Sequence, residues 1–124
     1  MKIHVKVDTG MSRLGFYFQD IERDKEAVSV VAEACRRPGL IPEGIFTHFA
    51  VADGGENGKA FTLKQFSCFM ALIAELEKQG IAEVLRPSEH IKISKVEKDP
   101  NKLESLYQLG LRDAERLLAD KQGT

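Results

Sequence analysis

The chain opens with KIHVKVDTGMSRLGF, residues 2–16, an alternating segment that runs into a turn. Apolar Ile3, Val5 and Val7 alternate with polar residues, and a period of two with β-branched side chains predicts a strand over residues 2–7. The Asp-Thr-Gly that follows breaks the alternation, because a glycine lets the backbone turn tightly. We therefore expect a strand whose carboxyl end leads directly into a polar turn.

The next residues alternate between helical and extended patterns. We expect a helix over residues 20–37 with Asp20 as its N-cap, and then a short buried strand over residues 43–50. Residues 53–58 have the glycine-rich composition of a flexible loop, and a second helix is expected over residues 62–80. Strands that alternate with helices indicate βαβ units with parallel strands, so the predicted fold class is α/β.

The pattern changes after the second helix. Two short extended pieces are expected at residues 84–87 and 91–94, around a Pro-Ser turn. We therefore divide the chain into residues 1–83 and residues 84–124. The 124 residues can bury a core, but they amount to only about half of a (β/α)8 barrel, which needs roughly 250 residues.

A helix with a strong start signal is expected near the end of the chain. Asp99 is a good N-cap, and Pro100 suits the first helical position. An apolar stripe follows: Leu103, Leu106, Tyr107, Ala114, Leu117 and Leu118. Gly110 is expected to mark a kink or a division into two shorter helices, and residues 120–124 are expected to be frayed.

Composition excludes several classes of protein. The chain is 43% hydrophobic and 30% charged with a net charge of −1, which gives no electrostatic basis for binding nucleic acid. No apolar run reaches the 18 or so residues of a membrane span, and the N-terminus does not look like a signal peptide. Cys35 and Cys68 are too few and too far apart for a disulfide framework or a metal site. We expect free thiols, no metal and a cytoplasmic location.

Two cations stand where a parallel α/β fold binds its ligands. Arg13 follows the carboxyl end of the first strand, and its planar guanidinium suits a carboxylate or a phosphate. Lys6 belongs to the same strand, and two cations so close repel each other. Either both side chains are solvated, or one of them is neutralised or modified within a site.

Three ordered motifs resemble alanine racemases, which use pyridoxal phosphate to interconvert L- and D-alanine. Residues 6–15, KVDTGMSRLG, are similar to the signature around the fifth barrel strand of that family. Residues 43–50, EGIFTHFA, resemble its next strand, and residues 62–66, TLKQF, resemble the helix that follows. The resemblance implies a partial (β/α)8-barrel fragment of β-α-β-α units, followed here by a short extended segment and a C-terminal helix.

The resemblance also implies roles for three side chains. Lys6 would be the lysine that is carbamylated in the family, which turns a cation into an anion. Arg13 would pair with that carbamate and reach toward the phenolic oxygen of pyridoxal phosphate and the carboxylate of the alanine substrate. His48 would lie beside the pyridine ring of the cofactor. Ser12 departs from the family, which usually has glycine at this position.

Other groups that the family needs do not appear in this sequence. The lysine that holds the cofactor is expected upstream of Met1, and neither the tyrosine base nor the His-x-x-Asn-Ser motif appears. Racemisation removes a proton from one face of Cα and returns one to the other, so it needs two positioned acid/base groups. We therefore expect a fragment related to alanine racemase that is inactive alone.

The second half resembles the C-terminal end of bacterial patatin-like phospholipases, over residues 85–122. The chain has no Gly-x-Ser-x-Gly nucleophile motif, so lipid hydrolysis is not expected, and the Asp-Gly-Gly at residues 53–55 is a coincidence. The alternative function is a non-catalytic interaction or remnant fusion module with a patatin-like tail. Two strands cannot close a barrel, and their open edges could pair two copies into a homodimer.

Overall fold

The computed structural model describes residues 1–92 and 96–123. The chain forms two compact units, Met1–Glu83 and Val84–Thr124, which pack mainly within themselves.

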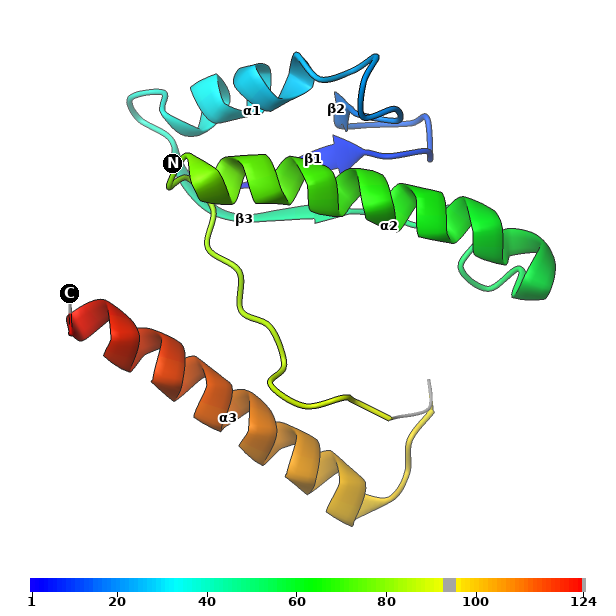
Figure 1. Cartoon of the computed structure of the whole chain (residues 1–124), viewed down its shortest axis with the longest axis vertical. Coiled ribbons are helices and arrows are strands. Elements are labelled where there is room, and N and C mark those ends of the chain that lie inside the picture. Colours follow the sequence, from blue (N-terminus) through cyan, green and yellow to red (C-terminus); the bar gives the residue numbers. More distant parts are fainter. Residues whose placement is uncertain (93–95, 124) are drawn as a thin grey trace. The chain divides into compact units, whose positions relative to one another are not determined.

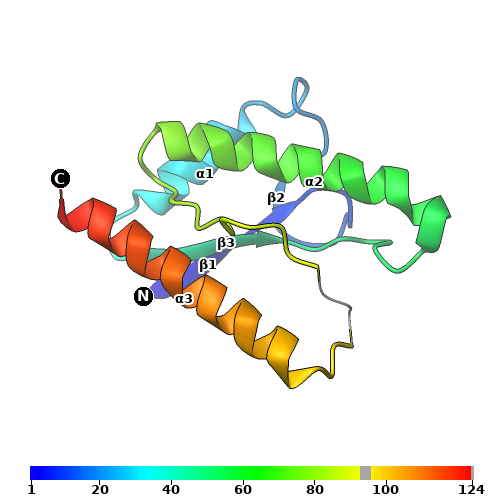
Figure 2. The same cartoon turned by 60° about the horizontal axis from the view of Figure 1, so that its bottom comes forward.

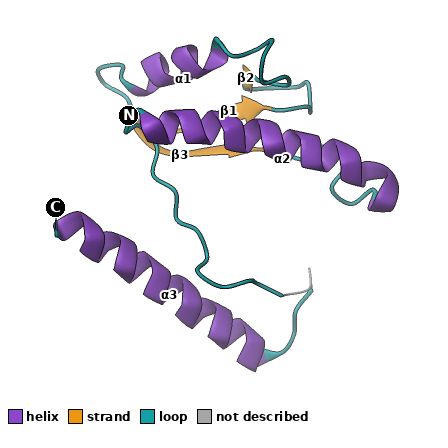
Figure 3. Cartoon of the chain, in the orientation of Figure 1, coloured by secondary structure: helices purple, strands orange, loops and turns teal. Residues whose placement is uncertain are grey.

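The first unit is built on a three-stranded parallel sheet. Its strands are β1 (Lys2–Asp8), β2 (Phe16–Tyr17) and β3 (Ile41–Thr47), in the order β2-β1-β3 (Figure 3). β1 pairs with both neighbours in parallel, which confirms the predicted α/β class. The short strand β2 was not expected from the sequence.

Two helices cover one face of this sheet. α1 (Ala27–Cys35) and α2 (Gly55–Lys78) lie on the same side of the strands (Figure 2). Between the helices and the sheet lies a core of buried side chains: Val5, Val7, Phe18, Val31, Ala32, Cys68, Leu72 and Leu76. The alternation of β1 places Val5 and Val7 in this core, as predicted, so Lys6 points to the other face of the sheet.

Both helices begin at positions that the sequence patterns did not predict. α1 begins at Ala27 and not at residue 20, because Asp20 organises a turn: its carboxylate accepts hydrogen bonds from the N–H groups of Glu22 and Arg23. α2 begins seven residues before Thr62, so the loop expected over residues 53–58 is largely helical. Thr62 lies inside the helix.

A close contact explains why the glycine-rich segment is ordered. A Cβ on Gly58 would collide with the carbonyl oxygen of Val51, and the Gly54 N–H donates to that same oxygen at 3.0 Å. The glycines therefore allow the helix to start against the chain that leaves β3. β3 itself lies two to three residues earlier than the predicted strand over residues 43–50.

The second unit contains the helix α3 (Pro100–Gln122), seen at the C-terminal end of the chain in Figure 1. Asp99 caps it by accepting a hydrogen bond from the Asn101 N–H, and proline stands in the first turn, as predicted. The helix continues through Gly110 without dividing, and it runs to Gln122 where a frayed tail was expected. The described residues 84–92 form no strand; residues 93 and 94 of the predicted extended piece lie outside the described residues.

Candidate functional site

A buried carboxylate shapes the turn that follows β1. Asp8 is 5% exposed, and its Oδ1 accepts hydrogen bonds from the N–H groups of Gly10 and Ser12, each at 3.0 Å. Its Oδ2 accepts from the Arg13 N–H at 3.0 Å, and the Gln19 side chain donates to Oδ1 at 3.2 Å. One side chain thus fixes the backbone up to the position that carries the Arg13 guanidinium.

The ionisation of Asp8 follows from these contacts. Burial by itself raises the pKa of the carboxyl, but hydrogen bonds from the N–H groups of Ser12, Gly10 and Arg13 and from Gln19 outweigh it, so the pKa lies below its ordinary value. Asp8 is therefore a carboxylate at neutral pH. Its oxygens are engaged by the turn, which makes it a structural anion and not a proton-transfer group.

Two backbone positions of the turn are unusual. Ser12 has a φ of 56°, a left-handed conformation that glycine adopts more readily. Gly15 has a φ of 121°, and a Cβ there would lie 2.6 Å from the Lys6 carbonyl oxygen. The turn thus folds tightly back on β1, which lets Phe16 pair beside Val7 in β2.

Lys6 and Arg13, which were predicted to pair, lie near the same turn. The Lys6 ammonium donates to the Leu14 carbonyl oxygen at 2.6 Å, inside the same turn. Arg13 is exposed, and within residues 1–92 and 96–123 no hydrogen bond or ion pair holds its guanidinium. The turn therefore gathers both cations at one end of β1 without a contact between them.

His48 lies at the same rim of the sheet. It follows β3 directly, and its side chain is exposed. Because β1 and β3 are parallel neighbours, the turn after β1 and the residue after β3 leave the sheet at the same edge, where parallel α/β proteins bind ligands. A hydrogen bond of 2.7 Å between the hydroxyls of Thr9 and Thr47 joins the two strand ends.

Gln65, on α2, connects the segments of this rim through hydrogen bonds, a role that no sequence motif predicted. Its side chain is 1% exposed. Its Nε2 donates to the His48 carbonyl oxygen at 3.0 Å and to the Thr9 hydroxyl at 3.2 Å, and its Oε1 accepts from the Ala50 N–H at 3.0 Å. The sequence signal that could have indicated its burial is its helical spacing from Cys68 and Leu72, which are also buried.

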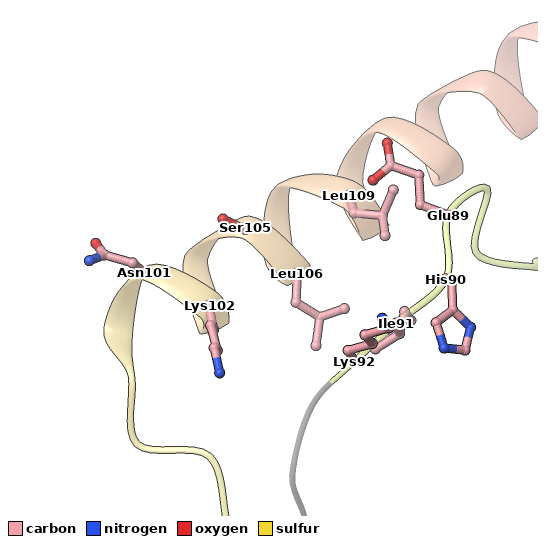
Figure 4. Close-up of a pocket in the computed structure, with 9 residues that line it drawn as sticks. All are labelled: Glu89, His90, Ile91, Lys92, Asn101, Lys102, Ser105, Leu106 and Leu109. Atoms are coloured by element: carbon pink, nitrogen blue, oxygen red, sulfur yellow. The ribbon is translucent and has the colours of Figure 1, made fainter.

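The second unit holds a separate cavity of about 390 Å³ (Figure 4). It lies between residues 89–92 and the first turns of α3, and Ile91, Leu106 and Leu109 supply apolar walls. None of the three predicted site residues lines it. Within the described part of the chain, no cluster of histidine, cysteine or acidic residues could hold a metal ion. None of the described helices is both long and apolar enough to cross a bilayer.

Two protein families match this sequence. The model of the family described as "Alanine racemase, N-terminal domain" matches residues 1–89. A second model, described as a domain of unknown function (DUF6363), matches residues 69–122. The two matches overlap in the second half of α2 and the segment after it.

Curated relatives of the first part are alanine racemases. The chain is 45% identical to that of Desulforamulus reducens over 84 residues, which cover 68% of this chain and 21% of the relative. It is 44% identical over 80 residues to that of Methanococcus maripaludis, covering 64% of this chain and 20% of the relative. It is 41% identical over 80 residues to that of Clostridium tetani, covering 64% of this chain and 19% of the relative. The chain spans about a fifth of the length of the curated relatives it matches.

Proposed function

The chain belongs to the alanine racemase N-terminal domain family, and from this we propose that residues 1–83 are a segment of a pyridoxal-phosphate site for alanine. The observation that carries the proposal is the shared edge of β1 and β3: Arg13 and His48 follow the carboxyl ends of these two neighbouring parallel strands. Cofactors of α/β proteins bind at such carboxyl-terminal rims.

The side chains of the rim suit pyridoxal phosphate. The Arg13 guanidinium is exposed and available to pair with the phenolic oxygen of the cofactor and with the carboxylate of alanine. The exposed His48 imidazole offers a flat surface for the pyridine ring. When bound, the cofactor supplies an electron sink that acidifies the Cα proton of the amino acid.

Lys6 has a supporting role in this proposal. Its amine faces the carbonyl oxygen of Leu14, in the turn that also carries Arg13. Carbamylation adds CO2 to the amine nitrogen and releases two protons. It would thus replace the ammonium by a carbamate anion, which removes the repulsion between the two cations and favours an ion pair with Arg13. Lys6 then orients the guanidinium and does not itself move a proton.

We further propose that the 124-residue chain alone does not racemise alanine. The sequence has no match to the family's cofactor-holding lysine segment or its tyrosine base, and Lys6, Arg13 and His48 supply binding and orientation only. The purified chain with added pyridoxal phosphate and L-alanine is therefore expected to form no D-alanine. Formation of D-alanine above the rate of cofactor in buffer would contradict this part of the proposal.

A chimera tests the proposed site itself. The segment of the Desulforamulus reducens alanine racemase that matches this chain over 84 residues is replaced by the residues of this chain. We expect the chimera to bind pyridoxal phosphate and to form D-alanine, because the relative supplies the lysine and the tyrosine. A folded chimera without cofactor binding would contradict the proposal. The matched variant is the same chimera with the substitution His48→Ala, which should weaken cofactor binding.

The alternative is a non-catalytic interaction module. The division into a racemase-related part, 1–83, and a tail, 84–124, is supported by the compact-unit boundary between Glu83 and Val84. The patatin-like character of the tail stays a prediction, since the family that matches it has no known function. The outer edge of β3 pairs with no strand of the described residues, so it is open to a strand from a second copy or another chain.

The cysteines support the proposed cytoplasmic location. Cys35 and Cys68 are both free thiols, and such thiols persist in compartments that are kept reducing.

A further inference from the structure

One face of α3 carries a row of exposed apolar side chains. We call it the α3 stripe, and its large members are Leu103, Tyr107, Leu111 and Leu118, which are 45%, 63%, 42% and 58% exposed. Their spacing of three or four residues, with Ala114 between the last two, places them along one side of the helix. The residues that face the rest of the second unit, Leu109 and Asp113, are a different set and are buried.

The α3 stripe is symmetric about its centre. The midpoint lies between Gly110 and Leu111. Leu103 and Leu118 are equally far from it along the chain, and so are Tyr107 and Ala114. When such a helix is laid antiparallel on a copy of itself, each member of the stripe except the central Leu111 meets another member. Tyr107 then faces the small Ala114, and Leu111 faces Gly110, so large residues meet small ones near the centre, while Leu103 meets Leu118 at each end.

The glycine at the centre supports a close approach of another helix. Glycine in a helix interior is unfavourable relative to alanine by about 1 kcal/mol. Among the described residues of the second unit no contact offsets this cost, because a Cβ on Gly110 would meet no atom within 4 Å. An absent side chain at the midpoint of an apolar stripe leaves room for a bulky residue of a partner helix.

From the symmetric stripe we propose that α3 pairs antiparallel with α3 of a second copy of this chain, across a two-fold axis between Gly110 and Leu111. Such an interface is self-complementary, as two-fold dimers require.

The same geometry contains one unfavourable charge pair. Glu104 and Glu115 flank the stripe on one side, and antiparallel pairing brings Glu104 of one copy close to Glu115 of the other. The stripe is also short, and an interface below about 1,200 Å² is typical of weak association. The dimer is therefore reversible and depends on concentration.

The test measures the self-association of the full chain by sedimentation equilibrium between about 10 μM and 1 mM. The variant Leu111→Glu buries a charge at the centre of the pair and should raise the dissociation constant at least roughly tenfold. The matched control Ser105→Glu adds the same charge to an exposed position on the opposite side of α3 and should leave the constant unchanged. Circular dichroism verifies that each variant keeps its helices.

A gain of affinity separates the proposal from a loss of folding. Glu115→Lys turns the repulsion with Glu104 of the second copy into attraction, so it should lower the dissociation constant several-fold, and added salt should reduce the gain. A full chain that stays monomeric at 1 mM, or a dimer that is unaffected by both Leu111→Glu and Glu115→Lys, overturns the proposal. The second result would point to pairing through the open sheet edge instead.

Discussion

The side-chain amide of Gln65 donates a 3.0 Å hydrogen bond to the backbone carbonyl of His48, across the boundary between α2 and the end of β3. The same amide group reaches the Thr9 hydroxyl at the end of β1. A single buried residue therefore couples the two strand ends that carry the proposed site. Several expected effects of substitution follow from this coupling and from the turn after β1.

Replacing Gln65 by leucine should destabilise the first unit. Leucine has a similar size but leaves the His48 carbonyl, the Thr9 hydroxyl and the Ala50 N–H without this partner, at a cost of about 2 kcal/mol or more. Urea unfolding followed by circular dichroism measures the change. Gln79→Leu, at an exposed position just after α2, is the matched control and should change the free energy of unfolding by less than about 0.5 kcal/mol. Equal effects of the two substitutions would show that Gln65 does not organise the rim.

Gly15→Ala should be among the most damaging small changes in the chain. The left-handed φ of 121° and the approach of 2.6 Å to the Lys6 carbonyl oxygen both oppose a Cβ, so the expected loss is about 3 kcal/mol or more. Gly39→Ala separates the two causes, because Gly39 has a φ of 87° with nothing within 4 Å. That control should lose only about 1 kcal/mol in the same unfolding experiment. A mild Gly15→Ala would contradict the tight turn.

Asp8 should make the stability of the chain depend on acid pH. Its folded-state pKa lies below the ordinary value of 3.8, so its contribution is present above that value and is lost as the pH falls through the folded pKa. Asp8→Asn should therefore cost about 1–3 kcal/mol at pH 7, since the Arg13 N–H loses its acceptor. The difference between wild type and variant should shrink below about pH 4. A difference that is constant from pH 7 to pH 3 would exclude an ionised Asp8 as its source.

The two thiols should differ in reactivity. Burial raises the pKa of both Cys35 and Cys68, which lowers the fraction of reactive thiolate. Cys68 is buried in the core, whereas Cys35 is only partly buried. Iodoacetamide at pH 8 should therefore modify Cys35 first, as peptide mass spectrometry would reveal. Faster labelling of Cys68 would mean that the core opens between α1 and α2.

The sequence predicted those features that depend on regular spacing. The alternation of Ile3, Val5 and Val7 correctly placed β1 and its buried face, and Asp99 correctly marked the start of α3. β2 escaped prediction because two paired residues show no periodicity. The start of α2 was not predicted because the glycines of residues 53–58 suggest a flexible loop. In the structure Gly54 and Gly58 instead allow the helix to approach the backbone of Val51 closely.

For the candidate site, the sequence predicted only where its residues lie along the strands. The sequence places Arg13 and His48 after two parallel strands, and the structure has both strands side by side. Neither Gln65 nor the role of Asp8 could be predicted from spacing, because their partners come from segments that meet only in the fold. Hydrogen bonds between distant segments leave no periodic signal in a single sequence.

The rate of D-alanine formation by the chimera with Desulforamulus reducens racemase tests the central claim most directly, when it is measured with and without Arg13→Ala. If Arg13 pairs with the cofactor and the substrate, the substitution should lower kcat/KM by about 100-fold or more. The matched variant Arg37→Ala, at an exposed position away from the rim, should stay within about twofold of the parent chimera. An active chimera in which Arg13→Ala has no more effect than Arg37→Ala would contradict the account.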